Sequence, residues 1–400
     1  MGLSSSLQLF LFYFLGGKRD ENLILPVNSS LSATLGQNEL RAKTTVAVDS
    51  SFTEDKMWLN DKLCSFSTVR RRARKRKGDG DKSKIVSQKI HICSENNFPT
   101  AAGLASSAAG YACLVYSLSK LFDVDGEISD IARQGSGSAC RSVYGGFVEW
   151  QMGTKADGSD SFAKQITSAQ HWPEMCILIL VVSDQKKHTG STEGMQTSVQ
   201  NSRLLEKRIE VVPERMANIT KAIKEKDFHT FAEITMKDSN QFHAICLDTY
   251  PPISYMTDVS RQIVRFVHSF NNHSGETKVA YTFDAGPNAC LYLLEKDLGQ
   301  VISLVNHFFP ARDNGLNLKV QGLPVSIVEP SQVYIDALSL PVLPNSIKYL
   351  INTKVGTLLK YTVQYKYLII HRLVNYKNKL CNKKNSHNLT LFDVILFLEM

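Results

Sequence analysis

Residues Pro99 to Gly110 read PTAAGLASSAAG, and this stretch is the most informative in the sequence. It holds almost no side chain larger than threonine, follows a strand-like segment at 89–93 and opens a helical pattern at 105–121. Such a turn lets backbone N–H groups approach a polyphosphate, whose negative charge the helix N-terminus also favours. The alternative is a small-residue helix packed closely on a sheet. Spacing alone leaves both interpretations open.

The residues themselves set limits on the phosphate interpretation. No Lys-Ser or Lys-Thr pair follows the glycines, so the stretch does not match the Walker pattern of P-loop proteins. Ser106 and Ser107 could contact phosphate or Mg²⁺ through their hydroxyl groups. The ten histidines show no metal-ligand spacing. A bound metal would therefore use phosphate oxygens, hydroxyls or carboxylates, the ligands that suit Mg²⁺.

Strand and helix patterns alternate outward from this stretch. The predicted strands are 43–48, 89–93, 147–152, 176–183 and 278–283, and the predicted helices are 105–121, 128–134, 213–225, 228–238 and 254–270. A polar segment containing Pro173 separates two halves of the chain. We therefore expect an α+β fold with domains at 17–172 and 173–355. An atypical apolar segment, 1–16, and an atypical basic tail, 356–400, flank them.

Composition excludes several classes of protein. The 400 residues carry a net charge of +8, but the basic residues concentrate at 70–77 and beyond 354. The remainder of the chain is therefore not a basic surface for binding nucleic acid. No apolar stretch is long enough to cross a bilayer, and we expect no stable membrane association. The eight cysteines show no paired spacing, which favours a reducing, cytoplasmic location. Residues 7–15 have the outline of a secretory signal without its basic start, so secretion is the weakest option.

Three further segments carry polar groups suited to chemistry. GSGSACRS at 135–142 brings hydroxyls and Arg141 to a tight turn, either to bind a carboxylate or phosphate or simply to end a helix. Asp284 in TFDAGPN follows a strand and is either a general base or the cap of its own turn. KKHTGST at 186–192 is either a ligand-binding strand end or a basic loop. We interpret His243 as a residue of a helix face rather than a catalyst.

Six segments together resemble the mevalonate diphosphate decarboxylase family. This family belongs to the small-molecule kinase superfamily that includes galactokinase, homoserine kinase, mevalonate kinase and phosphomevalonate kinase. The segments are ENNFPTAAGLASSAAG (95–110), GSGSACRS (135–142), GGFVEWQMG (145–153), KDSNQFHA (237–244), DTYPPISY (248–255) and KVAYTFDAGPNA (278–289). The resemblance extends from about residue 17 to residue 355.

The resemblance implies a fold and a reaction. The fold would be two α+β domains, the first similar to ribosomal protein S5 domain 2, with the active-site cleft between them. The reaction would be ATP-dependent decarboxylation of mevalonate 5-diphosphate to isopentenyl diphosphate, with ADP, phosphate and CO₂ as products, in isoprenoid and sterol biosynthesis. It also implies ATP as co-substrate, Mg²⁺, and a cytoplasmic homodimer.

The resemblance assigns roles to residues that match the family's motifs. The implied catalytic residues are Asp284, Arg141, Ser138 and Lys18. Arg141 would hold the substrate carboxylate, and Lys18 would bind the diphosphate. The implied substrate-binding residues are Gly17, Lys18, Ser136, Gly137, Ser138, Ala139, Cys140, Arg141 and Thr192. The implied ATP-binding residues are Pro99, Ala102, Gly103, Leu104, Ala105, Ser106, Ser107 and Gly110, with Ser107 also near Mg²⁺ through the phosphates.

The sequence departs from the family at its ends. The family begins with a strand of the form A-P-x-N-I-A-x-x-K-Y-W-G-K-R-D, of which only Gly17 to Asp20 remains. We therefore expect the loss of substrate contacts and of one strand from the first domain. The family's ending is also replaced from about residue 356. Two alternatives follow: a catalytically impaired isoform, and a related kinase that does not decarboxylate.

Overall fold

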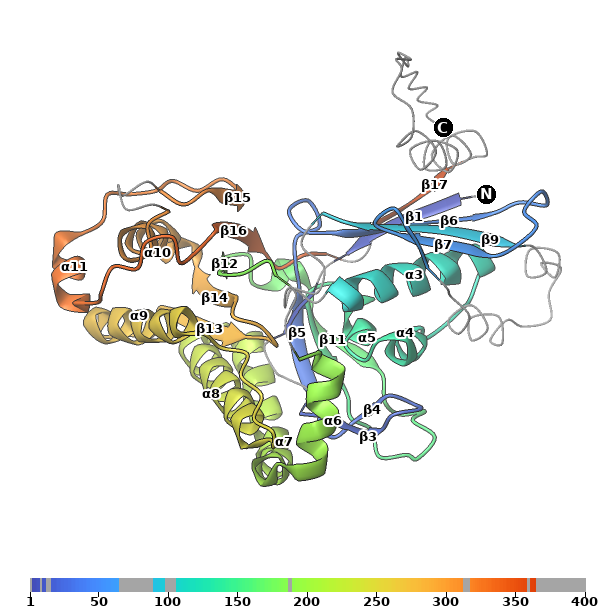
Figure 1. Cartoon of the computed structure of the whole chain (residues 1–400), viewed down its shortest axis with the longest axis horizontal. Helices are drawn as coiled ribbons and strands as arrows, with labels where there is room; N and C mark the ends of the chain where they lie inside the picture. Colours follow the sequence, from blue (N-terminus) through green and yellow to red (C-terminus); the bar gives the residue numbers. More distant parts are fainter. Residues whose placement is uncertain are drawn as a thin grey trace, which may run out of the picture.

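The computed structural model describes residues 2–7, 9–11, 16–64, 89–97, 106–185, 189–311, 317–357 and 360–364, with backbone alone for 2–7, 9–11, 106 and 360–364. It shows two α+β domains side by side (Figure 1). The N-terminal domain holds a six-stranded and a four-stranded sheet, and the C-terminal domain holds one five-stranded sheet. The prediction of an α+β fold with two domains is confirmed.

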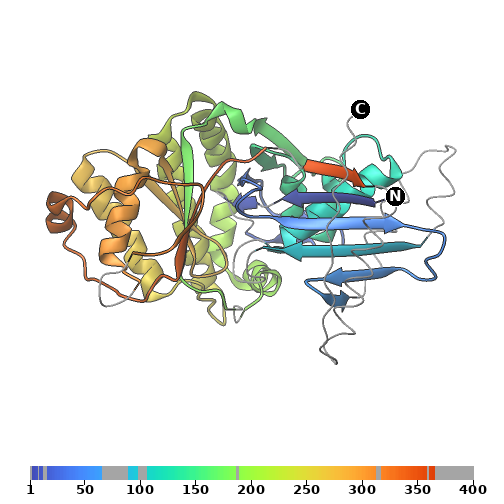
Figure 2. The ribbon, with the colours of Figure 1, turned by 90° about the horizontal axis from the view of Figure 1, so that it is seen from above.

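Figure 2 looks onto one face of the six-stranded sheet of the N-terminal domain. Its strands, in spatial order, are β17 (Lys360–Gln364), β1 (Gly2–Leu7), β6 (Ala42–Val48), β9 (Ile90–Asn96), β7 (Lys56–Leu59) and β8 (Lys62–Cys64). Helix α3 (Ser106–Phe122) packs against β1, β6 and β9. Its buried face of alanine, cysteine and leucine residues explains the small-residue composition of this stretch, because small side chains let a helix lie close to a sheet.

The second sheet of the N-terminal domain has four strands and lies next to the domain boundary. Its order is β11 (Ala163–Thr167), β10 (Phe147–Trp150), β5 (Ser30–Thr34) and β2 (Leu9–Leu11). Two short helices, α4 (Ser129–Gly135) and α5 (Ala139–Ser142), lie between α3 and this sheet. A small hairpin of β3 (Lys18–Asp20) and β4 (Leu25–Pro26) precedes β5.

The first domain does not lose its first strand. Residues Gly2–Leu7 pair antiparallel with β6 along their whole length, and β17 pairs with their other edge, so our expectation of a missing strand is wrong. Strand pairing uses backbone N–H and C=O groups, so a segment of different sequence can occupy the same place. Figure 2 shows the red strand β17 beside the dark blue strand β1.

The five-stranded sheet organises the C-terminal domain. Its order is β13 (Val279–Phe283), β14 (Ala289–Leu294), β12 (Met175–Val181), β16 (Tyr349–Lys354) and β15 (Val320–Gly322). The helices are α6 (Ser191–Asn201), α7 (Arg203–Glu225), α8 (Phe228–Asp248), α9 (Asp258–Ser274), α10 (Glu295–Phe308) and α11 (Gln332–Leu338), with a 3₁₀ turn at Ala169–His171. None of the helices in the described ranges is both long and apolar enough to cross a membrane.

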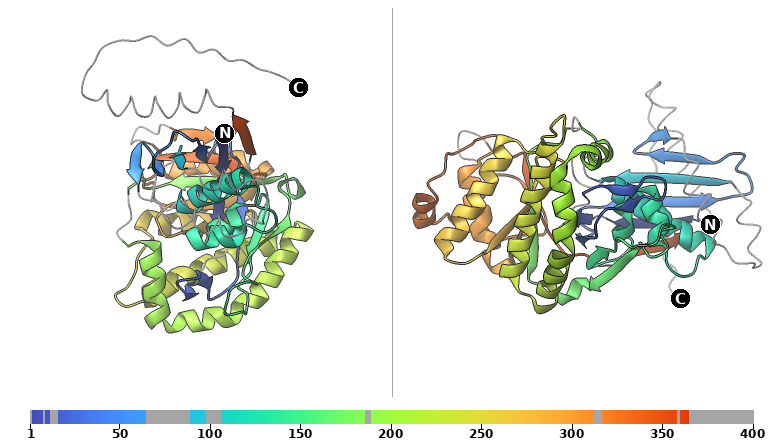
Figure 3. Two further views of the ribbon diagram at one scale, coloured as in Figure 1. Left: turned by 90° about the vertical axis from the view of Figure 1, so that its right-hand side faces the viewer. Right: turned by 90° about the horizontal axis from the view of Figure 1, so that it is seen from below.

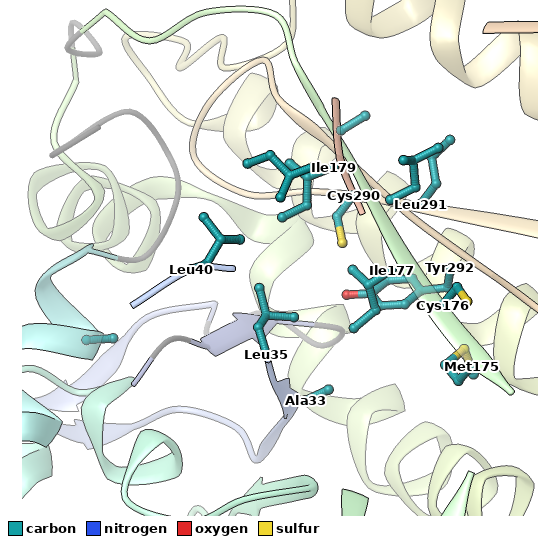
Figure 4. Close-up of a cluster of buried hydrophobic side chains, with 14 of the residues drawn as sticks. Ala33, Leu35, Leu40, Met175, Cys176, Ile177, Ile179, Cys290, Leu291 and Tyr292 are labelled. Carbon is teal, nitrogen blue, oxygen red and sulfur yellow. The ribbon is translucent and has the colours of Figure 1, made fainter. Parts of the chain in front are cut away.

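The chain returns to the N-terminal domain after β16. Gly356 donates its N–H to the Thr34 carbonyl at 2.6 Å and accepts from Gly146 N at 2.9 Å. One buried hydrophobic cluster runs from β5 through β12 and β14 to the helices of the C-terminal domain (Figure 4). Leu35, Ile177 and Tyr292 are among its labelled members. The two domains therefore share a continuous apolar core at their junction.

Most predicted elements exist, and three helices have different bounds. The helix predicted at 213–225 begins at Arg203 and continues through Pro213, because the face from Leu205 to Ile223 is buried and stabilises the turn before the proline. The helix predicted at 228–238 runs ten residues further, to Asp248. The helix predicted at 254–270 begins at Asp258, where Thr257 forms a capping box with Ser260.

Candidate functional site

Arg141 occupies the centre of the site. Helix α5 places its side chain fully inside the protein, where Nε donates to Ser32 Oγ at 3.0 Å and Nη1 donates to Ser30 Oγ. The guanidinium carbon lies 5.7 Å from the centre of the Trp150 ring. Among the described residues, Nη2 has no hydrogen-bond partner. A guanidinium with an unused donor has the geometry that a planar anion such as a carboxylate needs.

The charge of Arg141 is coupled to Asp284 in the other domain. Burial lowers the pKa of the guanidinium to about 10, while Cys140 and Asp284 act in the opposite direction. Arg141 therefore stays protonated at neutral pH. Asp284 is half-buried at the end of β13, and its carbonyl accepts from Gly286 N at 2.6 Å. The carboxylate predicted as a base and the predicted carboxylate-binding arginine thus come together across the domain boundary.

The serine–glycine turn before Arg141 is shaped by its neighbours. Ser136 ends α4 in extended backbone, and Ser138 is the residue before α5. A methyl group added at Gly137 would lie 2.9 Å from the Trp150 ring, so only glycine fits there without displacing the indole. Cys140 is buried in a side cluster with Trp150, and Ala139 is buried in the main hydrophobic core, so neither side chain is exposed. Burial raises the pKa of the Cys140 thiol to about 12, which keeps it neutral.

Ser30 and Ser32 are site residues that the sequence analysis missed. They stand two positions apart on β5, so both side chains face the same side of the strand and meet Arg141. Both are completely buried. The alternation of serine with apolar residues in this strand was the available signal, since a polar face inside a core needs a polar partner.

Gly17 and Lys18 lie where the C-terminal domain meets the β3–β4 hairpin. A methyl group at Gly17 would overlap the side chain of Val199 in α6, and one at Gly16 would overlap Leu205 in α7. Figure 3 shows these green helices beside the dark blue hairpin. Lys18, in β3, is half-buried. Glycines at these positions leave room for the side chains of Val199 and Leu205, and Lys18 is the cation next to that contact.

The remaining predicted residues lie at the start of α6, at the start of α3 or outside the described residues. Thr192 is exposed in the first turn of α6. Ser107 is exposed in the first turn of α3, and no atom of the described residues lies within 4 Å of a methyl group added at Gly110. The predicted ATP-binding residues Pro99, Ala102, Gly103, Leu104 and Ala105 and the basic run at 70–77 lie outside the described residues. In the part of the chain that the structure describes, no group of three histidine, cysteine, aspartate or glutamate side chains is arranged to hold a metal.

A two-domain α+β fold in which a buried arginine interacts electrostatically with a carboxylate of the other domain is suited to an enzyme that acts on an anionic substrate. Residues 12–163 match the diphosphomevalonate decarboxylase-like N-terminal domain, and residues 177–358 match the mevalonate 5-diphosphate decarboxylase C-terminal domain. The chain belongs to the mevalonate diphosphate decarboxylase family, a family of carboxy-lyases.

Relatives and solved structures agree with this assignment. The diphosphomevalonate decarboxylase of Danio rerio is 55% identical over 350 residues, 85% of this chain and 87% of that protein. The structure of mevalonate diphosphate decarboxylase from Trypanosoma brucei is 37% identical, with a TM-score of 0.84 over 92% of this chain and 100% of that one. A structure described as MDDEF in complex with MVAPP, AMPPCP and magnesium is 27% identical, with a TM-score of 0.69 over 91% of this chain and 99% of that one.

Proposed function

We propose that this chain performs the ATP-dependent decarboxylation of mevalonate 5-diphosphate to isopentenyl diphosphate, with release of ADP, phosphate and CO₂. The observation that carries the proposal is the fully buried Arg141, with its unused Nη2 donor, coupled to Asp284 of the other domain. A tertiary alcohol that also bears a carboxylate needs these two groups together. The carboxylate of Asp284 acts on the hydroxyl, and the guanidinium holds the group that leaves as CO₂.

The proposed reaction has two stages, phosphorylation of the 3-hydroxyl and then elimination of phosphate and CO₂. Asp284 orients the 3-hydroxyl and accepts its proton while the oxygen attacks the γ-phosphorus of ATP and ADP leaves. The C–O bond of the phosphorylated carbon then breaks with loss of phosphate. The electron pair of the bond to the carboxyl carbon becomes the new C=C bond as CO₂ leaves. Arg141 keeps the carboxylate in one orientation throughout, and Lys18 pairs with the diphosphate at the other end of the substrate.

We further propose that Ser107 and the start of α3 receive the phosphates of ATP. α3 has 17 residues, so its N-terminal turn carries the full partial positive charge of a helix end, and the Ser107 side chain is exposed there. Hydroxyl and phosphate oxygens are donors that fit Mg²⁺, which would neutralise the phosphoryl charge. Ser136, Ser138 and Thr192 supply hydroxyls on the substrate side.

Assembly and location follow from the same assignment. We propose a cytoplasmic homodimer, supported by the family membership and by the cysteines, seven of which are free thiols in the described residues. We also propose domain limits of 17–172 and 173–355. Strand β17 then acts as an added edge of the N-terminal sheet, since it pairs with β1.

The test is release of CO₂ and phosphate from mevalonate 5-diphosphate and ATP by purified chain, with Asp284→Asn as the paired variant. We expect turnover that the variant lowers by about 10³-fold or more, because the amide cannot accept the proton. ADP without CO₂ would indicate a kinase instead. A folded chain that binds substrate without turnover would indicate an impaired isoform.

A further inference from the structure

Strand β13, which ends just before Asp284, is an edge strand. It pairs with β14 on one side, and helix α8 packs along its other side. Every second residue of an edge strand points its N–H and C=O away from the sheet, and these groups need partners when they are buried. Phe283 is completely buried, so both of its outward groups need one.

Two side chains of α8 supply those partners. Ser239 Oγ accepts from Phe283 N at 3.1 Å, and His243 Nε2 lies 3.1 Å from the Phe283 carbonyl oxygen. Because a carbonyl only accepts, His243 donates from Nε2. The two residues are four positions apart, so they lie on one face of the helix, one turn from each other. The backbone immediately before Asp284 is therefore held at both of its polar groups.

The ionisation of His243 fits this role. Burial lowers its pKa to about 4, and the hydrogen bond to Phe283 opposes that shift only in part. The ring is therefore neutral at physiological pH, with its one proton on the nitrogen that faces the carbonyl. A neutral donor holds the strand without adding a positive charge beside the Asp284 carboxylate.

The other end of the Asp284 loop is anchored as well. Ser260 of α9 donates to the Pro287 carbonyl at 2.9 Å. Asn288 Oδ1 accepts from Val182 N at 2.8 Å and Ser183 N at 2.9 Å, which ties the loop to the end of β12. Asp284 is thus the first residue of a short loop fixed on both sides.

We propose that Ser239 and His243 are positioning residues that set the place of the Asp284 carboxylate by holding the backbone of Phe283. This inference rests on the proposed function, because it concerns the same site. Neither side chain is proposed to touch the substrate. Their effect passes through one peptide unit, and a carboxylate displaced by about 1 Å loses its alignment with the reacting hydroxyl.

The same strand offers a matched control. Asn271 of α9 donates from Nδ2 to the Val279 carbonyl at 2.8 Å and accepts from Val279 N at 3.0 Å. It is buried like His243 and satisfies the same pair of edge groups, but at the far end of β13, four residues before Phe283. A purely structural role predicts equal consequences for losing either contact.

The experiment compares His243→Leu, Ser239→Ala and His243→Gln with Asn271→Leu. We expect His243→Leu to lower kcat by about 10- to 100-fold with KM for both substrates nearly unchanged. Ser239→Ala should lower kcat by a smaller factor, and His243→Gln, which keeps a donor, should restore part of the loss. Asn271→Leu should lower the midpoint of thermal unfolding to a similar degree and leave kcat within about twofold, as expected for a contact remote from the reacting atoms.

Two results would overturn the proposal. One is a kcat for both His243→Leu and Ser239→Ala within twofold of wild type. The other is an equal kcat loss in Asn271→Leu. If His243→Leu does not fold, Ser239→Ala, which removes a single oxygen, decides the matter alone. Crystal structures of wild type and Ser239→Ala, superposed on β12 and β14, report the position of Asp284 even if the wild-type chain shows no turnover. A carboxylate that has not moved in the variant counts against the positioning role. Absence of turnover in the wild type counts instead against the proposed function.

Discussion

Arg141 and Asp284 lie 143 positions apart in the sequence and in different domains, yet the carboxylate stabilises the charged form of the guanidinium. Neither residue could interact with the other if the domains were separated. The continuous core at the junction holds the two domains together and makes this pairing possible. The interaction between Arg141 and Asp284 is therefore a property of the whole chain rather than of either domain.

Replacing Arg141 by lysine should abolish most of the activity while keeping the charge. An ammonium group cannot donate to Ser30, Ser32 and a substrate carboxylate in one plane. We expect kcat/KM to fall by about 10²-fold or more, measured by phosphate release at varied mevalonate 5-diphosphate. A variant with wild-type kinetics and an unchanged unfolding midpoint would contradict the role assigned to the guanidinium fork.

The ion pair of Arg208 with Asp238 should matter to stability more than to chemistry. Both side chains are fully buried, and Arg208 Nη1 and Nη2 donate to the two oxygens of Asp238 at 2.6 and 3.0 Å. Removing one partner leaves a buried charge without its counter-ion, so Asp238→Ala should lower the free energy of unfolding by about 3–5 kcal/mol. Urea denaturation at pH 7 measures it.

The control for that prediction is the double variant Arg208→Met, Asp238→Leu. Two apolar side chains of similar size remove both charges together, so much of the loss should be recovered. A double variant as unstable as Asp238→Ala would show that packing of these side chains, rather than the unpaired charge, causes the loss.

His243 should make the protein less stable in mild acid. Its pKa in the folded chain is about 4, below the ordinary value of 6.5, so the unfolded chain binds the proton first. The stabilising contribution is complete above about pH 6.5 and is lost as the pH falls towards 4, by about 3 kcal/mol in total for this group. Denaturant titrations at pH 7 and pH 5 of wild type and His243→Gln measure it. The free energy of unfolding should depend less on pH in the variant, and an equal pH dependence in the two proteins would refute the assignment.

Gly137→Ala tests the turn before Arg141. The added methyl group would press on the Trp150 ring, whose indole N–H donates to Ser161 Oγ at 3.1 Å. We expect a loss of about 1–3 kcal/mol in the free energy of unfolding. We also expect a lower kcat, because Trp150 packs beside the Arg141 guanidinium. Gly110→Ala is the comparison for stability alone, since no atom of the described residues lies within 4 Å of the position that its methyl group would take; an equal loss of stability in the two variants would contradict the steric explanation.

Local patterns sufficed for much of the fold. The apolar run at 176–183 became the buried strand β12, and the helical pattern predicted at 105–121 became α3, because burial and periodicity act within a single element. The bounds of α7 were missed because Pro213 is an unfavourable helix residue whose cost is offset by contacts with α8. The first strand was missed because its pairing depends on backbone groups rather than on side chains.

Sequence by itself was enough to predict which residues carry the chemistry: the arginine after a serine–glycine turn, the aspartate at a strand end and the hydroxyls at the start of a small-residue helix. Chemical type and local spacing are properties of a short segment, so they can be recognised there. Only the tertiary structure brought Arg141 to Asp284, placed Ser30 and Ser32 beneath the guanidinium, and set Ser239 and His243 on the backbone of Phe283. These contacts join segments far apart in the chain, and their geometry depends on how helices and sheets pack rather than on any one segment.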